Sequence, residues 1–283
     1  MRVACELGPR VRLLALTSSA TRFAELRALG ITPLLGDLDK PASISRIAGL
    51  ADRVVHLAPP PNEGRHDPRT RALLLALRRR HAVRALVYGS TSGVYGDCQG
   101  ELVTELRAVN PETIRAQRRI DAERMVRHFG RATGARATVL RIPGIYAPNR
   151  EGGTPRARLL KGTPVLQEKD DVFTNHIHAD DLARACVAAL WRGAAGRVYN
   201  INDDAQHKMG DYFDLAADLY GLPRPPRLPR AQAQDQLPVM LLSFMNESRR
   251  MDNARMKSEL RLRLRYPSVL EGLADGAVPM RTP

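Results

Sequence analysis

Cysteine, aromatic residues and long apolar runs are all scarce in this sequence, and each shortage excludes a class of protein. The three cysteines, Cys5, Cys98 and Cys186, are odd in number and lack the spacing of zinc ligands, which argues against a disulfide framework and favours a reducing compartment. No run approaches the ~20 apolar residues that span a membrane, and residues 1–10 lack the apolar core of a signal peptide. We therefore expect a cytoplasmic protein with no membrane partner.

Lysine is scarce as well, because only five of the 44 basic residues behind the net charge of +14 are lysine. The arginines are spread along the chain, are not interleaved with aromatic residues, and form no zinc-finger, basic-zipper or RNA-binding pattern. This distribution favours an anionic small ligand over a nucleic-acid partner. With 283 residues, 43% of them hydrophobic, the chain suits one large α/β domain with a smaller appendage.

The first 148 residues alternate between short apolar runs and amphipathic stretches. The predicted strands are residues 11–16, 32–35, 53–57, 85–88 and 136–141, and the predicted helices are residues 21–29, 41–50, 67–80 and 111–133. Strands and helices that alternate at this spacing predict an α/β fold with a doubly wound, Rossmann-like parallel sheet. We assign this first domain to residues 1–148.

Residues 149–283 are less regular, and we interpret them as a smaller lobe over the sheet edge, partly interleaved with the first domain. The expected elements are a helix within residues 176–192 that Asp180 caps, a strand at 197–201, an amphipathic helix at 209–220, an extended proline-rich connector at 223–229, and a short helix that begins at Asn253 and ends near residue 260.

The stretch Arg84–Gly96, RALVYGSTSGVYG, marks the first candidate ligand site. The apolar run Ala85–Tyr88 predicts a buried parallel strand, and the small, hydroxyl-rich turn Gly89–Gly93 follows it directly. Ligands of open α/β sheets bind outside the carboxyl ends of the strands, where this turn would lie. A plain Ser/Gly loop would have the same composition.

One cluster of residues raises the question of a metal site. His176 and His178 are followed by Asp180 and Asp181, and alternation along a strand would place both imidazoles on one side. A strand end followed by a helix cap explains the same four residues, so we predict no metal.

Several motifs in this order resemble the extended and atypical short-chain dehydrogenase/reductases, the group called NAD-dependent epimerase/dehydratase-like. The segments that carry the resemblance are GDLD (36–39), HLAPPP (56–61), STSGVYG (90–96), LRIPGIYAP (140–148), HIHADDLARA (176–185), YNIND (199–203) and NARMKSEL (253–260). The resemblance covers nearly the whole chain. It implies an NAD(P)-dependent oxidoreductase or epimerase/dehydratase-like protein that acts on a small or nucleotide-linked substrate, with a homodimer through the two long helices.

The resemblance also implies roles for particular residues. Asp37, with Leu38, would lie near the adenine of the cofactor, and Ala58 and Pro59 would pass beneath the cofactor. Thr91 stands where these enzymes keep a hydroxyl that hydrogen-bonds the substrate oxygen. A turn or cap role for Asp37 fits the sequence equally well.

The catalytic tyrosine and lysine of such enzymes, four residues apart on the long helix, are absent. Arg115 and Arg119 take their places, and Tyr95 of the VYG element is expected to pack in the core. Arginine stays charged in proteins and cannot act as the base. The two arginines would bind a phosphate, a ribose or a carboxylate, or they belong to a solvated helix face. We predict that Thr91, Arg115 and Arg119 converge on one cleft. A non-catalytic dinucleotide-binding or regulatory protein and an inactive remnant remain alternatives.

The start of the sequence departs from the resemblance too. The first forty residues contain only Gly8, Gly30 and Gly36, so there is no glycine-rich turn for a pyrophosphate, and residues 2–7 look like the tail of a helix. We expect the product to begin upstream of Met1, with a further strand at the centre of the sheet, and the 283-residue chain to be unstable without it. Ser18 and Arg22, with no Asp or Glu between Gly8 and Phe23, favour NADP over NAD.

Overall fold

The computed structural model describes residues 1–9, 11–238, 241–242 and 245–274. Its main sheet has four parallel strands in the order β10 (Val198–Asn200), β6 (Arg136–Ile142), β4 (Ala85–Thr91) and β3 (Arg53–His56). Tyr88 of β4 lies opposite His56 on one side and Val139 on the other. The residues of β4 are nearly all buried, as expected for a parallel strand with helices on both faces.

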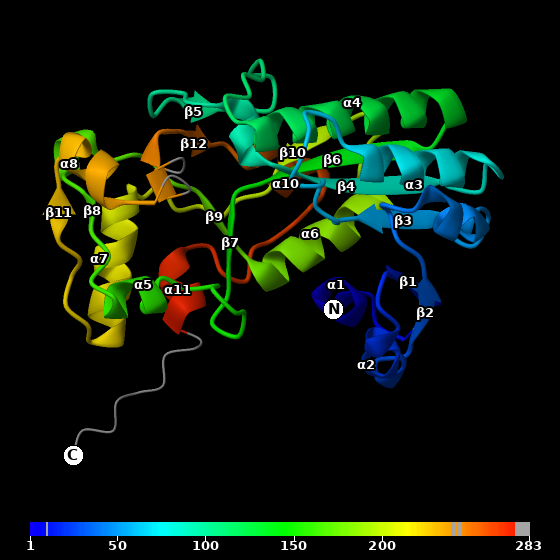
Figure 1. Cartoon of the computed structure of the whole chain (residues 1–283), viewed down its shortest axis with the longest axis horizontal. Helices are drawn as coiled ribbons and strands as arrows, with labels where there is room; N and C mark the ends of the chain where they lie inside the picture. Colours follow the sequence, from blue (N-terminus) through cyan, green and yellow to red (C-terminus); the bar gives the residue numbers. More distant parts are fainter. Residues whose placement is uncertain (10, 239–240, 243–244, 275–283) are drawn as a thin grey trace.

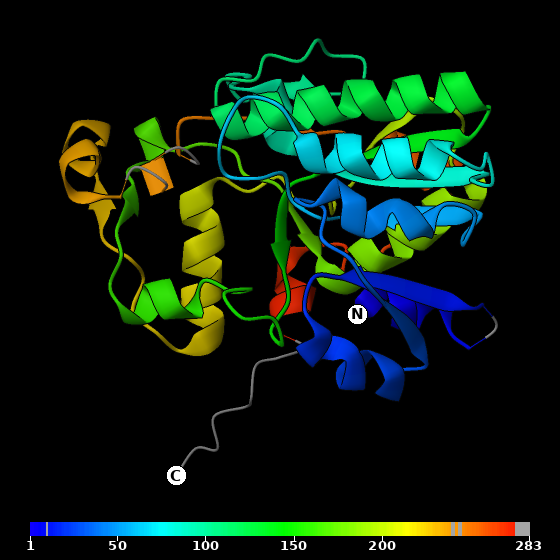
Figure 2. The same cartoon turned by 45° about the vertical axis from the view of Figure 1, so that its right-hand side comes forward.

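Two long helices cover one face of this sheet and a third covers the other (Figures 1 and 2). The first pair is α3 (Pro68–Arg78) and α4 (Ile114–Thr133), and the third helix is α6 (Ala179–Arg192). The predicted helix at 111–133 begins three residues later than expected because the Thr113 side chain caps it by accepting from the Ala116 N–H. The arrangement confirms the predicted doubly wound α/β fold.

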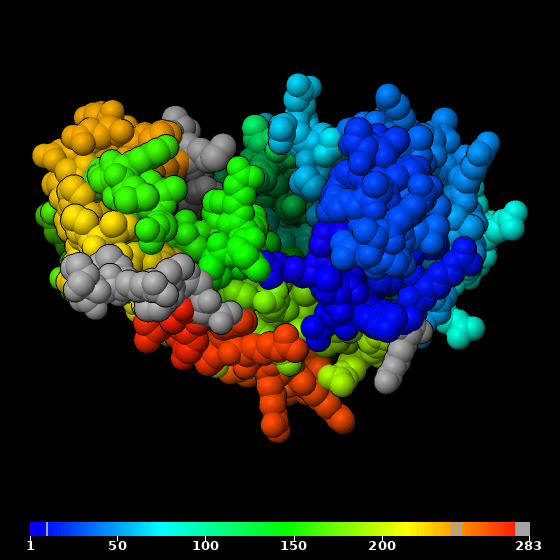
Figure 3. Space-filling view, turned by 90° about the horizontal axis from the view of Figure 1, so that it is seen from below, coloured from blue at the N-terminus to red at the C-terminus, as the bar shows by residue number. Residues whose placement is uncertain are grey.

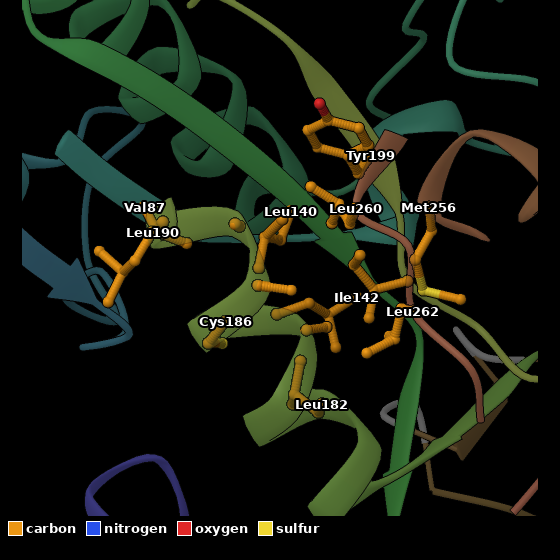
Figure 4. Close-up of a cluster of buried hydrophobic side chains, with 14 of the residues drawn as sticks. Val87, Leu140, Ile142, Leu182, Cys186, Leu190, Tyr199, Met256, Leu260 and Leu262 are labelled. Atoms are coloured by element: carbon orange, nitrogen blue, oxygen red, sulfur yellow. The ribbon is translucent and has the colours of Figure 1, made fainter. Parts of the chain in front are cut away.

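The core between the sheet and α6 is the larger of two apolar layers (Figure 4). Side chains from β4, β6 and α6 meet there with residues from the end of the chain, and the labelled members are Val87, Leu140, Ile142, Leu182, Cys186, Leu190, Tyr199, Met256, Leu260 and Leu262. A second layer, which includes Leu73, Leu77, Val126 and Phe129, packs α3 and α4 onto the opposite face. Burial on both faces stabilises the four-stranded sheet.

The first two strands of the chain do not join the main sheet. The strands β1 (Leu13–Thr17) and β2 (Ile31–Leu35) pair in parallel as a separate two-stranded sheet beside the β3 edge (Figures 1 and 2). Among the described strands, β1 pairs only with β2 and β3 only with β4. All five residues of β1 are half-buried, whereas six of the seven residues of β4 are buried.

Short helices surround the two-stranded sheet. They are α1 (Arg2–Leu7), η1 (Ala20–Arg22), α2 (Phe23–Ala28) and η2 (Pro41–Ile47). The helix predicted at 41–50 forms as the tighter 3₁₀-helix and ends earlier than predicted, at Ile47. Its Ile44 packs with Ala72 and Ala76 of α3, and this small cluster ties the two-stranded sheet to the rest of the domain.

We expect the β1–β2 sheet to open far more often than the main sheet, because an isolated strand pair is marginal in water and β1 is only half-buried. Hydrogen exchange should show protection factors in β1 at least about tenfold lower than in β4 and β6. Equal protection in β1 and β4 would contradict this. The expected instability of the whole 283-residue chain stays a prediction.

A second lobe lies beyond the carboxyl end of the sheet (Figure 1). It contains β7 (Gly144–Tyr146), α5 (Arg156–Leu160), β8 (Val165–Leu166), η4 (Glu168–Asp170), β9 (His176–His178), α7 (Met209–Tyr220), β11 (Arg227–Leu228), α8 (Arg230–Gln236) and α11 (Val269–Ala274). Seen from below, the blue N-terminal segment and the yellow to orange second lobe lie on opposite sides, and the molecule is hollowed between them (Figure 3).

The chain crosses between the lobes several times. Although β10 and α6 follow residue 148, they belong to the main sheet and its cover. Near the end of the chain, β12 (Arg250–Met251) pairs with β5 (Leu102–Val103), and α10 (Ala254–Glu259) packs beside β10. No helix in the described part of the chain has the length and apolarity needed to cross a membrane.

Two helix-cap predictions were wrong, and the extended connector predicted at 223–229 has one further feature. Asp180 does not cap α6; the ring nitrogen Nδ1 of His178 accepts the Asp180 N–H at 3.2 Å, while the Asp180 carboxylate binds Arg2. Asn253 precedes α10 without capping it through its side chain, because its amide donates to the carbonyls of Asn202 and Asp203. The proline-rich connector contains a short strand, β11, which pairs with β8.

Candidate functional site

A cavity of about 560 Å³ lies at the carboxyl end of β4, between the main sheet and the second lobe. Both lobes line it. The first contributes the turn after β4, the 3₁₀-helix η3 (Ser92–Tyr95), and the first turns of α4, and the second contributes β7, α5, β9, α7 and residues 247–249. This is the edge at which open α/β sheets bind ligands.

The end of β4 is fixed by a buried charge network. The Ser90 hydroxyl donates to Glu123 Oε1 at 2.6 Å, and the Arg141 guanidinium donates to both carboxylate oxygens of Glu123, at 3.2 and 2.9 Å. Arg141 and Glu123 are only 4% exposed, so each charge depends on the other in a site that water does not reach. The network therefore sets the position of the next residue, Thr91.

The structure brings Thr91, Arg115 and Arg119 together around this one cavity. The Thr91 oxygen accepts the Gly93 N–H at 3.3 Å, which leaves the hydroxyl proton available for a ligand oxygen. Arg119 lies one turn after Arg115 and donates through Nη1 to the Gly89 carbonyl at 2.8 Å and to the Tyr88 hydroxyl at 3.1 Å. Arg119 is thus held against β4, while Arg115 is exposed at the cavity.

Tyr95 lies outside the cavity lining and is fully buried. Its hydroxyl donates to Asn200 Oδ1 at 2.7 Å, and the Arg141 guanidinium lies 4.7 Å from the centre of its ring. Burial raises the pKa of the Tyr95 hydroxyl, which keeps the proton in place. These contacts give Tyr95 a packing role.

The lining of the cavity is strongly cationic. Five arginines line it, namely Arg115, Arg119, Arg150, Arg158 and Arg249, against the single carboxylate of Glu247 among the described residues. That carboxylate is paired with Arg249 at 2.8 Å. His176 also lines the cavity, but burial lowers its pKa to about 3, so the imidazole is neutral and the positive charge comes from arginine. Such a site binds anions.

Sequence reasoning missed most of the second-lobe lining. Tyr146 and His176 lie in quoted motifs, yet nothing in those motifs showed that the two side chains meet in a cavity with Tyr212 and Phe213 of α7. Arg158 is one arginine among many in an irregular segment. Only the fold separates it from the solvated arginines.

The residues assigned to the cofactor lie at the ends of β1, β2 and β3, and none of them lines the cavity. Ser18 and Arg22 are exposed after β1, with Arg22 Nε paired to Glu25 Oε2 at 3.3 Å. After β2, Asp37 Oδ1 accepts the Asp39 N–H at 2.9 Å, and Leu38 packs beside Ile44.

The loop after β3 is tied to the loop after β2 by one arginine of α3. Arg69 donates to the carbonyl of Pro59 at 3.1 Å and holds both oxygens of Asp39, while Ala58 is half-buried beside them. The half-buried carboxylate of Asp37 is not paired with a cation in the described part of the chain. Residues 1–40 provide no glycine-rich turn of the kind that binds a pyrophosphate.

A family model with the description "NAD dependent epimerase/dehydratase family" matches residues 2–202. The chain is 28% identical over 211 residues to a UDP-glucose 4-epimerase of Corynebacterium glutamicum, which covers 67% of this chain and 64% of the relative. It is 30% identical over 190 residues to a dTDP-glucose 4,6-dehydratase of Mycobacterium tuberculosis, which covers 60% and 57%. The chain thus spans less than two thirds of the length of either relative.

Solved structures share the fold over nearly the whole chain. A functionally unknown conserved protein from Silicibacter pomeroyi superimposes with a TM-score of 0.82 at 30% identity, and the match covers 98% of this chain and 95% of that one. The dTDP-glucose 4,6-dehydratase DesIV of Streptomyces venezuelae, solved as a double mutant with NAD bound, gives a TM-score of 0.75 at 20% identity over 95% and 87% of the two chains.

Proposed function

The chain belongs to the NAD dependent epimerase/dehydratase family, and we propose that it is an NAD(P)-dependent oxidoreductase or epimerase/dehydratase-like enzyme acting on a small or nucleotide-linked substrate. The observation that supports this best is the convergence of Thr91, Arg115 and Arg119 on one cavity at the carboxyl end of β4. Both curated relatives have names that specify a nucleotide sugar, UDP-glucose or dTDP-glucose. A bound dinucleotide would supply the hydride chemistry.

In this proposal the residues of the chain bind and orient the substrate. The Thr91 hydroxyl donates to a substrate oxygen, since its own oxygen already accepts the Gly93 N–H. Arg115 and Arg119 neutralise negative charge on the substrate and do not transfer protons, because arginine keeps its proton. Residues 149–283 act as the substrate lobe over a dinucleotide-binding domain at 1–148, and Asp37, Leu38, Ala58 and Pro59 contact the adenosine half.

One observation favours a non-catalytic, dinucleotide-binding role as the second candidate. Arg119 stands at the position of the missing lysine, but its Nη1 donates to the Gly89 carbonyl and to the Tyr88 hydroxyl. These two contacts hold the α4 helix to β4, which is a structural role. Burial raises the pKa of Tyr88 to about 12, so this tyrosine holds its proton at neutral pH. The homodimer and the cytoplasmic location also stay predictions.

For the cofactor itself we propose a preference for NADP. Ser18 and Arg22 follow β1, where a 2′-phosphate would be read, and Arg22 is held only by an exposed pair with Glu25. We expect NADPH to bind about tenfold more tightly than NADH in a fluorescence titration. A tenfold difference is what one charge-assisted hydrogen bond between Arg22 and the 2′-phosphate would contribute at an exposed site.

The variant Arg22→Ala should remove this preference by weakening NADPH alone. Arg27→Ala is the matched control, because Arg27 is an exposed arginine of the adjacent helix α2 that rests over the Phe23 ring. Tighter binding of NADH than NADPH would contradict the preference. No saturable binding of either dinucleotide would contradict the proposed function as a whole.

A further inference from the structure

The second-lobe end of the cavity holds an arginine that has no counter-charge in the part of the chain that the structure describes. Arg158 lies on α5 and lines the cavity, with its guanidinium carbon 4.3 Å from the centre of the Phe213 ring. Its Nε and Nη2 atoms are buried and make no hydrogen bond to any described residue. Burial lowers the pKa of Arg158, and the only group that opposes this is the nearby Tyr212.

Other arginines of this protein with little exposure either pair with a carboxylate or, like Arg118 and Arg136, donate to backbone carbonyls, and Nε and Nη2 of Arg158 do neither. Arg141 binds Glu123, Arg249 binds Glu247, and Arg227 binds Asp214 with Asp171 nearby. A buried guanidinium without a partner is unfavourable, so the exception at Arg158 calls for a neutralising group from outside the chain. Exceptions of this kind occur in natural proteins at functional sites.

A second arginine stands at the same cavity. Arg150 belongs to the loop after β7, is exposed, and donates through Nη1 to the Ile145 carbonyl at 3.1 Å. Glu247 is the only carboxylate among the described lining residues, and Arg249 already pairs with it. Among the described residues, the chain therefore offers Arg158 and Arg150 no unpaired anion.

We propose that Arg158, assisted by Arg150, binds an acidic group, phosphate or carboxylate, on the ligand that occupies this cavity. A guanidinium presents parallel N–H groups that match two oxygens of either group, and the aromatic ring of Phe213 supports its flat face. The inference deepens the proposed function by specifying an acidic substrate. It places that acid at the second-lobe end, away from Thr91 on β4.

The test measures binding of inorganic phosphate and of succinate by calorimetry and by thermal shift, at constant ionic strength and without dinucleotide. Comparing the two probes distinguishes a phosphate-bearing ligand from a carboxylic acid. We expect saturable binding of at least one probe, and a loss of at least about tenfold in affinity for Arg158→Met, as for removal of a charge-assisted contact. The unliganded variant should melt at the same temperature as the wild type or higher, because an uncompensated buried charge has been removed.

Arg156→Met is the matched control, since Arg156 is an exposed arginine on the same helix that does not line the cavity. It should keep the wild-type affinity. Arg158→Lys keeps the positive charge but lacks the two parallel N–H groups of the guanidinium, so this variant should also bind the probes more weakly than the wild type. It provides the test if Arg158→Met does not fold. Wild-type affinity in both Arg158 variants, or no binding of either probe to the wild type, would overturn the proposal. Because no dinucleotide is present, these outcomes are independent of the cofactor titration.

Discussion

Glu123→Gln should destabilise the protein by about 3–5 kcal/mol, the loss typical of breaking a buried ion pair by removing one partner. The Glu123 carboxylate accepts from Arg141 and from the Ser90 hydroxyl, and both charged side chains are only 4% exposed. With a neutral amide at position 123, the Arg141 charge stays buried beside the Tyr95 ring without compensation. Urea denaturation measures the change, and the melting temperature should fall by on the order of 10 °C.

Two further variants separate the charge effect from loss of packing. Replacing both partners, Glu123→Met with Arg141→Met, should recover a large part of the lost stability, because no charge is then left unpaired. Asp218→Asn is the control for an exposed pair: Asp218 and Arg224 are more than half exposed, and the change should stay below about 1 kcal/mol. Equal losses for Glu123→Gln and Asp218→Asn would contradict the buried network.

The same network explains which parts of the site were predictable. The apolar run at 85–88 predicted a buried strand with Thr91 in the turn after it; the structure extends the strand to Thr91 and puts this residue at the cavity. The one-turn spacing of Arg115 and Arg119 predicted a shared face, since residues four apart on a helix are neighbours. Both inferences use local periodicity, which one sequence contains.

The remaining residues of the cavity depend on contacts between segments far apart in the chain. Arg158 looks like any solvated arginine until α5 packs against α7, and Glu247 becomes a cavity residue only when its segment returns to the turn at Gly93. Local capping rules failed for a similar reason. Asp180 has the right residue type and position, but Arg2 binds its carboxylate and His178 supplies the cap.

Asp203→Asn should stabilise the protein at alkaline pH and have little effect in acid. The Asp203 carboxyl, 1% exposed, follows β10; one oxygen accepts the Ala205 N–H at 3.2 Å and the other has no described partner. Burial and, to a smaller extent, the nearby carboxylates of Asp204 and Glu271 together raise its pKa to about 8. The folded protein therefore binds this proton more tightly than the unfolded chain does, so stability falls as the pH rises from about 4 to about 8.

Removing the ionisable group abolishes this loss in the free energy of unfolding. For a shift of about four pKa units the loss at pH 9 is several kcal/mol, and at most about 5 kcal/mol. Urea denaturation at pH 5 and pH 9 compares the wild type with Asp203→Asn. Asp218→Asn is the control, because Asp218 is exposed, pairs with Arg224 and does not act on Asp203; it should gain nothing at pH 9. If Asp203→Asn stabilised the protein no more at pH 9 than at pH 5, Asp203 would already be ionised at neutral pH.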